Sequence, residues 1–320
     1  MNKSHPQADS SRLRHLDALR GIAAVAVVYV HCAGLVAVDH VMLNLLGHAP
    51  VIFFFLLSGY VLTKSLQIHA QLTPRIILQF YVKRFFRLYP AVFASLVIAL
   101  ILAQFFFSPQ KMEGVSIPFG GLIDKAMTVR TAPKFIDELS LTKMKLIPPL
   151  WTIKAEFLGS AVLPIIIIAL RKWPWLAMPL FLIFTTFLAR GDLIGFPRNN
   201  IFAPQYFILP FLLGCLVFLF RPKTNILTPY ASKWCLFYGV LLIIFTVNKE
   251  MSNVNTVDAF ESLILAGILF VIVPCNITSL KYTLESPFLQ FFGGISYGLY
   301  LIHVPILHFF GLAWQNILPI

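Results

Sequence analysis

Long apolar blocks constrain this sequence more than any other feature. The blocks run for about 18 to 22 residues, the length at which an α-helix crosses the hydrocarbon core of a bilayer. Hydrophobic residues make up 58% of the 320 residues and charged residues only 12%, whereas soluble domains are about a quarter charged. Because a backbone in lipid must satisfy its own hydrogen bonds, such blocks predict helices. We therefore expect an all-α, polytopic transmembrane bundle.

The chain divides into a short polar tail and a series of spans. Residues 1–15 are polar and basic, and no obvious cleavage site separates them from the first span, which is expected to be an uncleaved anchor. Residues 108–149 are too polar to span and are expected to form one large loop; a tenth span results only if part of this loop enters the membrane. The nine expected spans are Leu16–Val36, Ala49–Leu66, Pro90–Phe107, Leu150–Leu170, Pro174–Leu188, Pro204–Phe220, Trp234–Val247, Ala259–Cys275 and Phe288–Leu312.

The basic residues favour a cytoplasmic N-terminus, because Lys and Arg collect in cytoplasmic loops. With the tail inside, fifteen of them fall in cytoplasmic segments and three in the short outer loops. The loop 108–149 is then extracytoplasmic, and nine spans place the C-terminus outside. The same bias accounts for the net charge of +12, so we expect no nucleic-acid partner.

The four cysteines are expected to be small core residues. All of them lie in apolar runs, without CxxC spacing and without a pattern that pairs them with histidines. Neither a disulfide framework nor a metal site is indicated by such a pattern. The cysteines are Cys32, Cys215, Cys235 and Cys275.

Polar residues within the first span are the strongest functional signal. Asp17, Arg20 and His31 interrupt an otherwise small or apolar stretch. A charge or imidazole at membrane depth is costly unless it has a partner or a task. His31 lies about 20 Å along the helix from Asp17 and is expected in the outer half of the membrane. Asp17 is too far from His31 to pair with it and is interpreted as a helix cap or a partner for Arg20.

A basic cluster is expected at the cytoplasmic face. Arg84 and Arg87 are three residues apart and share one side of a helix. Guanidinium groups at this spacing hold phosphate oxygens with bidentate geometry. The simpler alternative is an anchor that binds lipid headgroups. Arg20 lies inside the first span, where it is not needed to set the orientation of the protein in the membrane. Its presence therefore favours a functional cluster of three arginines.

A second cluster is expected nearer the outer face. It contains His31, Glu156 and His303, each inside a span. A carboxylate beside an imidazole fixes its tautomer and raises its basicity, which suits a general base; a packed structural role remains the alternative for each residue. Tyr297 and Tyr300 add hydroxyl groups next to His303. No pair of these histidines has HxxxH spacing, so we expect no metal.

Ser58 and Gly59 interrupt a hydrophobic helix, where small residues permit close helix approach or a kink beside a ligand. The sequence has no GxSxG elbow, no P-loop and no GxGxxG motif. This argues against a serine hydrolase, a nucleoside triphosphatase and a dinucleotide-binding site.

Five stretches, taken together and in this order, resemble the acyltransferase-3 family of integral membrane O-acyltransferases. The similarity covers residues 16 to about 305. Thr152 departs from the serine that the family motif has at this position, and the chain ends 17 residues after His303, where many members have a further helix. The five stretches are LDALRGIAAVAVVYVH, FFFLLSGYVLT, KRFFRLYP, LWTIKAEF and ISYGLYLIH.

The resemblance implies one transmembrane acyltransferase domain over 16–320. The sequence carries no appended hydrolase-like domain, so this domain is expected to act alone or with a partner. Such an enzyme moves an acyl group, often acetyl from acetyl-CoA, to a hydroxyl of an envelope carbohydrate or similar acceptor. No tightly bound cofactor is implied. The expected partners are acyl-CoA, a carbohydrate or lipid-linked glycan and membrane lipid, and the expected location is the bacterial inner membrane.

The resemblance and the expected depths together predict roles for individual residues. His31 is expected to be the general base, and Glu156 to orient His31 or bind the sugar. His303 completes the catalytic group. The cofactor-binding set is Arg20, Arg84, Arg87, Ser58 and Tyr60, and the supporting set is Trp151, Tyr297, Tyr300 and Asp17.

Two alternatives belong to other classes of protein. A proton-coupled transporter or flippase would use intramembrane His, Glu and Arg to carry protons or an anionic or lipid-linked substrate. It would show inverted repeats and paired broken helices, which the sequence does not suggest. A non-catalytic scaffold would leave the intramembrane polar residues unexplained. Incubation with labelled acetyl-CoA separates a transferase from a transporter.

Overall fold

The structure is a computed structural model of the chain, and its description is confined to part of the sequence. The described residues are 13–35, 41–106, 132–142, 144, 146–177, 179, 208–221, 233–234, 236–241, 254–272 and 282–317.

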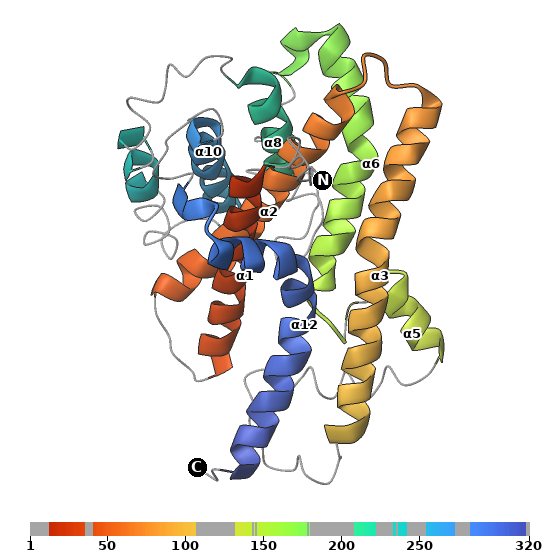
Figure 1. The fold of residues 1–320 in the computed structure, drawn as a ribbon, viewed down its shortest axis with the longest axis vertical. Coiled ribbons are helices and arrows are strands. Elements are labelled where there is room, and N and C mark those ends of the chain that lie inside the picture. Colours follow the sequence, from red (N-terminus) through yellow and green to blue (C-terminus); the bar gives the residue numbers. More distant parts are fainter. Residues whose placement is uncertain are drawn as a thin grey trace, which may run out of the picture.

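The described part of the chain is helical and contains no strand, which confirms the all-α prediction (Figure 1). Five of its helices are long and apolar enough to cross a membrane, and a shorter apolar helix accompanies them. The expected spans Pro174–Leu188, Pro204–Phe220, Trp234–Val247 and Ala259–Cys275 lie partly outside the described residues. The elements are α1 (Arg14–Leu35), α2 (Val41–Gln67), α3 (Pro74–Phe106), α5 (Ala132–Leu139), α6 (Leu150–Lys172), η2 (Pro174–Leu176), α8 (Ile208–Phe220), α10 (Val254–Ile272) and α12 (Pro287–Ile317).

Helix α2 is the central element of the bundle. It packs against α1, α6, α8 and α10, while α12 packs against α1 and α3. Figure 1 shows α3 and α6 along one side and α10 on the other. Four helices, α1, α2, α6 and α12, therefore converge near the centre of the molecule.

Helix α3 differs from its prediction. A new span was expected to open at Pro90, after the basic cluster that contains Arg84 and Arg87. The structure instead has one continuous helix of 33 residues that carries Pro90 inside it. At a rise of about 1.5 Å per residue it is about 50 Å long, well over the thickness of a bilayer core. Arg84 and Arg87 consequently lie within a long helix and not before the start of a span.

Glycines permit the close crossing of α1 and α12. A Cβ atom added to Gly21 would lie 2.5 Å from the backbone nitrogen of Gly293, and one added to Gly293 would lie 2.5 Å from the carbonyl oxygen of Asp17. Only a residue without a side chain fits such a contact. At the same end, Gln290 Nε2 donates a hydrogen bond to the carbonyl oxygen of Arg14 at 2.7 Å. Two helices from opposite ends of the sequence are thus held together.

A second close crossing joins α2 to α8. A Cβ atom at Gly59 would collide with the carbonyl oxygen of Phe211, and one at Gly214 would collide with that of Leu56. The prediction that Gly59 permits close helix approach is confirmed. Cys215, next to this crossing, is a buried free thiol, and Cys32 is also free.

Candidate active site

A cavity of about 50 Å³ lies where α1, α2, α6 and α12 converge. Residues spaced three or four apart on a helix share one face, so α2, α6 and α12 each contribute a short stripe to the wall and α1 contributes one residue. The lining residues are Arg20 of α1; Val51, Phe54, Phe55 and Ser58 of α2; Thr152, Ile153 and Glu156 of α6; and Ser296, Tyr297 and Tyr300 of α12.

Glu156 is the centre of a polar network at one end of this cavity. Its carboxylate forms an ion pair with the guanidinium of Arg84 and accepts a hydrogen bond from Ser58 Oγ at 2.8 Å. Arg84 Nε also donates to Ser160 Oγ at 3.2 Å. Arg84 is only 7% exposed. The network ties α2, α3 and α6 together through the buried guanidinium of Arg84 and the half-buried carboxylate of Glu156.

The position of Glu156 corrects the sequence prediction. This carboxylate was expected beside His31, at a different depth from the arginines, whereas it bonds directly to Arg84. The reason is the continuity of α3, which carries Arg84 into the interior of the bundle. Ser160, which the sequence analysis missed, is four residues after Glu156 on the same side of α6, and that spacing was a usable signal.

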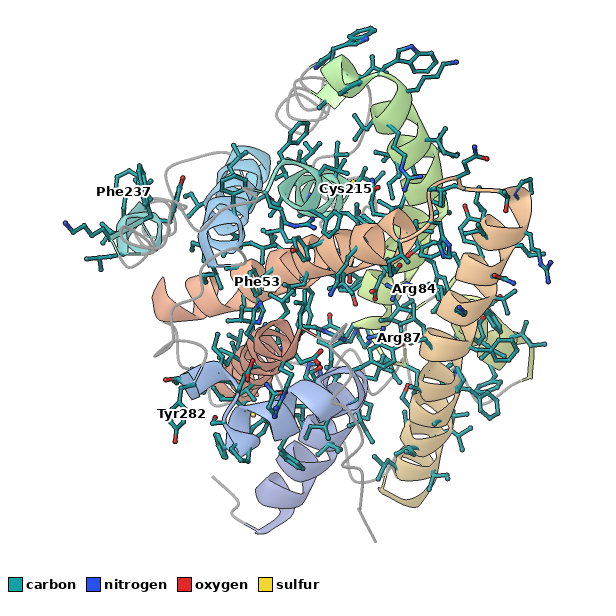
Figure 2. The ribbon with its side chains drawn as sticks, turned by 45° about the horizontal axis from the view of Figure 1, so that its top comes forward. Phe53, Arg84, Arg87, Cys215, Phe237 and Tyr282 are labelled. Atoms are coloured by element: carbon teal, nitrogen blue, oxygen red, sulfur yellow. The ribbon has the colours of Figure 1, made fainter. Side chains whose placement is uncertain are left out.

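The three predicted arginines gather around the same end of the cavity. Arg20 lines it and lies 3.8 Å from Asp17, as expected for a partner of that carboxylate. Figure 2 shows Arg84 and Arg87 on the side of α3 that faces the other helices. Arg87 interacts electrostatically with Arg20, Arg84 and Glu156. Unlike Arg84, however, Arg87 is exposed, so the two guanidinium groups are not equivalent.

His31 of α1 and His303 of α12 form a pair. Their ring centroids are 4.9 Å apart and the rings meet edge to face at 76°. Nδ1 of His31 lies 2.8 Å from the carbonyl oxygen of Val27, and Nδ1 of His303 lies 2.6 Å from that of Tyr300. Because a carbonyl oxygen only accepts, each Nδ1 carries a proton. In the neutral rings Nε2 is then the basic nitrogen.

Tyr300 connects the histidine pair to the cavity. Its buried ring lies 5.6 Å from the ring of His303 and 5.8 Å from that of Phe54, which is also in the cavity wall. Tyr297 also lines the cavity, but its hydroxyl donates to the carbonyl oxygen of Leu88 at 3.0 Å and joins α12 to α3. Of the two tyrosines, only Tyr300 has its ring against His303 among the described contacts.

The remaining predicted residues have packing positions. Tyr60 is 2% exposed, and its ring lies 5.2 Å from that of Phe218 in the core between α2 and α8, outside the cavity lining. Ser58, two residues earlier, lines the cavity because it lies on another side of α2. Trp151 lies against Phe55, at a centroid distance of 6.4 Å, and supports the wall from behind.

Metal-binding groups do not gather anywhere in the part of the chain that the structure describes. Within those residues, no cluster of three or more His, Cys, Asp or Glu side chains is placed to hold an ion.

Comparison with known proteins gives a match over nearly the whole chain. A family described as an acyltransferase domain matches residues 13–319. One curated relative, the peptidoglycan O-acetyltransferase OatA of Listeria monocytogenes, is 24% identical over 318 residues. The match covers 91% of this chain and 49% of the relative, so the chain spans about half the length of that protein. No solved structure matches.

Proposed function

Because this chain belongs to the acyltransferase-3 family, we propose that it transfers an acetyl group from acetyl-CoA to a hydroxyl group of an envelope glycan. The observation that carries the proposal is a single cavity between α1, α2, α6 and α12, with arginines at one end and, through Tyr300, a pair of histidines at the other. A glycan acceptor is supported by the relative named for peptidoglycan O-acetylation.

The arginine end suits the phosphates of CoA arriving from the cytoplasm. Arg87 is exposed and meets the phosphates first, while Arg20 lines the cavity beyond it. Charge-assisted hydrogen bonds from guanidinium to phosphate are among the strong ones. The buried guanidinium of Arg84 adds a third positive charge next to this end of the cavity and is held in position by Glu156 and Ser160. Glu156 thus acts as a positioning residue for Arg84 and not for His31.

The histidine end supplies the base. Nε2 of His31 takes the proton from the acceptor hydroxyl, and the oxygen attacks the thioester carbonyl carbon. The carbon–sulfur bond then breaks, and the CoA thiolate leaves and receives the proton. General base catalysis of this kind contributes about 10²–10⁴-fold. His31 is half-buried and the more accessible ring, whereas His303 is 3% exposed and holds its partner edge to face.

The proposal is tested with the full chain in proteoliposomes. Radiolabelled acetyl-CoA is supplied on one side and peptidoglycan fragments on the other, and the product is identified by mass as one acetyl group added to the glycan. His31→Ala is expected to lower the rate by about 10²–10⁴-fold. His69→Ala is the matched control, because His69 is exposed in the turn after α2. Wild-type protein that transfers nothing, or His31→Ala with undiminished transfer, overturns the proposal.

A further inference from the structure

Five hydroxyl groups line the cavity, and three of them already donate their proton to charged or carbonyl oxygens of the protein. A hydroxyl carries one proton and therefore serves one acceptor at a time. These three are consequently poor candidates for a hydrogen bond to a ligand. The pairs, with the donor first, are Ser58 and the carboxylate of Glu156, Ser296 and the carbonyl oxygen of Gly293, and Tyr297 and the carbonyl oxygen of Leu88.

The other two hydroxyls, those of Thr152 and Tyr300, are bonded to each other. Thr152 Oγ1 donates to the carbonyl oxygen of Pro149 at 2.8 Å, which commits its proton. Since the hydroxyl of Tyr300 is hydrogen-bonded to Thr152, the tyrosine is the donor in this bond. Its acceptor is a neutral hydroxyl, whereas a hydrogen bond to a negatively charged oxygen is about twice as strong. Among the hydroxyls that line the cavity, Tyr300 is therefore the one whose proton an anionic oxygen would attract.

Tyr300 lies at a level between the arginine end of the cavity and the histidine pair. Helices α1 and α12 cross at Gly21 and Gly293, next to Arg20. Tyr300 is about 10 Å along α12 from this crossing, and His303 is about 5 Å further. The rings of Tyr300 and His303 are 5.6 Å apart. A thioester whose phosphates are held at the arginines, and whose carbonyl carbon is attacked by an oxygen beside the histidines, belongs at this level.

The ring of Tyr300 is held in place by its neighbours. It is 8% exposed and packs against the ring of Phe54 at a centroid distance of 5.8 Å. Nδ1 of His303 also donates to the carbonyl oxygen of Tyr300 at 2.6 Å. A donor held in this way needs little reorganisation when negative charge develops, which is the condition under which such hydrogen bonds contribute most to catalysis.

We propose that Tyr300 donates the hydrogen bond that stabilises the oxyanion of the acyl transfer, and that Thr152 is a positioning residue that holds the tyrosine hydroxyl. This inference rests on the proposed acyl transfer and adds the group that stabilises its transition state. As His31 takes the proton from the acceptor hydroxyl, the acceptor oxygen bonds to the thioester carbon and the carbonyl oxygen gains an electron pair. Tyr300 turns its O–H from Thr152 to this oxyanion and keeps its proton. When the carbonyl re-forms, the carbon–sulfur bond breaks, and the thiolate receives the proton from His31.

The first test removes one hydroxyl and keeps the ring. The full chain in proteoliposomes receives acetyl-CoA and peptidoglycan fragments. Because the bond to the oxyanion is made only in the transition state, Tyr300→Phe is expected to lower kcat by about 10²–10³-fold with little change in the KM for acetyl-CoA. Tyr81→Phe is the matched control, since its hydroxyl donates to the carbonyl oxygen of Ala161 at 2.8 Å, outside the cavity lining. This control should retain the wild-type kcat.

The second test separates positioning by Thr152 from packing. Thr152→Val keeps the shape and loses the hydroxyl, and it is expected to lower kcat by less than Tyr300→Phe because the tyrosine keeps its own proton. Thr152→Ser retains the hydroxyl and should restore most of kcat, whereas a packing role for the methyl group would make serine the worse substitute. In the background of Tyr300→Phe, Thr152→Val should have no further effect on kcat, because the two hydroxyls act as a unit.

The outcomes separate this proposal from the proposed function. Tyr300→Phe with wild-type kcat, or with a raised KM and an unchanged kcat, overturns the oxyanion role while leaving acyl transfer intact. If thermal unfolding in detergent shows that Tyr300→Phe does not fold, the Thr152 variants decide: a lower kcat in Thr152→Val than in Thr152→Ser supports the proposal, and equal values overturn it. Wild-type protein that transfers nothing overturns the proposed function instead.

Discussion

At the scale of single residues, the ion pair between the half-buried Glu156 and the buried Arg84 organises the centre of the molecule. Ser58 and Ser160 complete its hydrogen bonds, so that neither charge is left uncompensated. Removing one partner of a buried ion pair is costly because the other charge stays buried, whereas replacing both by apolar groups is often tolerated. This difference tests whether Glu156 and Arg84 stabilise the fold as a pair.

Glu156→Ala is expected to destabilise the protein by about 3–5 kcal/mol, because the guanidinium of Arg84 loses its partner in the interior. The double variant Glu156→Leu with Arg84→Met should recover most of this loss while remaining inactive. Thermal unfolding in detergent measures the stability, and Glu285→Ala, a change at a half-buried residue before α12, is the control. A single variant as stable as wild-type protein would contradict the interpretation of the pair.

Arg87→Gln is expected to raise the KM for acetyl-CoA by about 10- to 100-fold, since a hydrogen bond to a charged group contributes about 1.5–3 kcal/mol. The fold itself should be unaffected because Arg87 is exposed. Lys83→Gln, one turn earlier on the same helix and also exposed, serves as the matched control. Equal KM values for the Arg87 and Lys83 variants, measured in steady-state assays, would count against a phosphate contact at Arg87.

At the scale of elements, the crossing of α1 and α12 brings the two histidines together. The helices touch through the backbones at Gly21 and Gly293, and the chain then runs on to His31 and His303 on the facing sides. The spacing of the histidine rings therefore depends on a contact that lies about three turns away along each helix.

Gly293→Ala is expected to lower both the melting temperature and the rate of acyl transfer, because its Cβ would lie 2.5 Å from the carbonyl oxygen of Asp17. The neighbouring Gly294→Ala provides a matched control, since a Cβ there meets nothing within 4 Å. Alanine is favoured over glycine in a helix by about 1 kcal/mol, so Gly294→Ala should be neutral or stabilising. Identical behaviour of the two variants in unfolding and activity assays would argue against the crossing as the reason.

At the scale of the whole molecule, the proposed chemistry requires donor and acceptor on opposite sides of the bilayer. The turn after α2 precedes the basic first part of α3, whereas α5 belongs to the segment expected on the other side. The arginines of the site lie towards the side of the turn after α2, which is expected to be cytoplasmic. The histidine pair lies further along α1 and α12, towards the expected outer side.

The orientation predicts a labelling pattern for single cysteines in intact cells. His69→Cys, in the turn after α2, should resist a membrane-impermeant maleimide until the membrane is opened, whereas Ser140→Cys, after α5, should react from outside. Both positions are exposed, and wild-type protein controls for its own thiols. Labelling of both sites from the same side would invalidate the proposed path of the donor.

The sequence by itself determined the class of the protein and the polar residues of its site. Apolar blocks of membrane length can arrange only as spanning helices, because lipid offers the backbone no hydrogen bonds. His31 and Glu156 stand out for the same reason: polar groups in such blocks need a partner or a task. Arg84 stood out through its spacing of three residues to Arg87. The pairing of Asp17 with Arg20 and the close approach at Gly59 also followed from local spacing.

Only the tertiary structure decided which of these residues meet. The rise of a helix gives the depth of a residue along its own axis, but it does not give the offset between two helices. Proline at position 90 suggested a boundary, yet α3 continues through it and carries Arg84 to Glu156. The crossing of α1 and α12 likewise joins His31 to His303 across the whole sequence. These contacts depend on packing between helices, which no single stretch of sequence records.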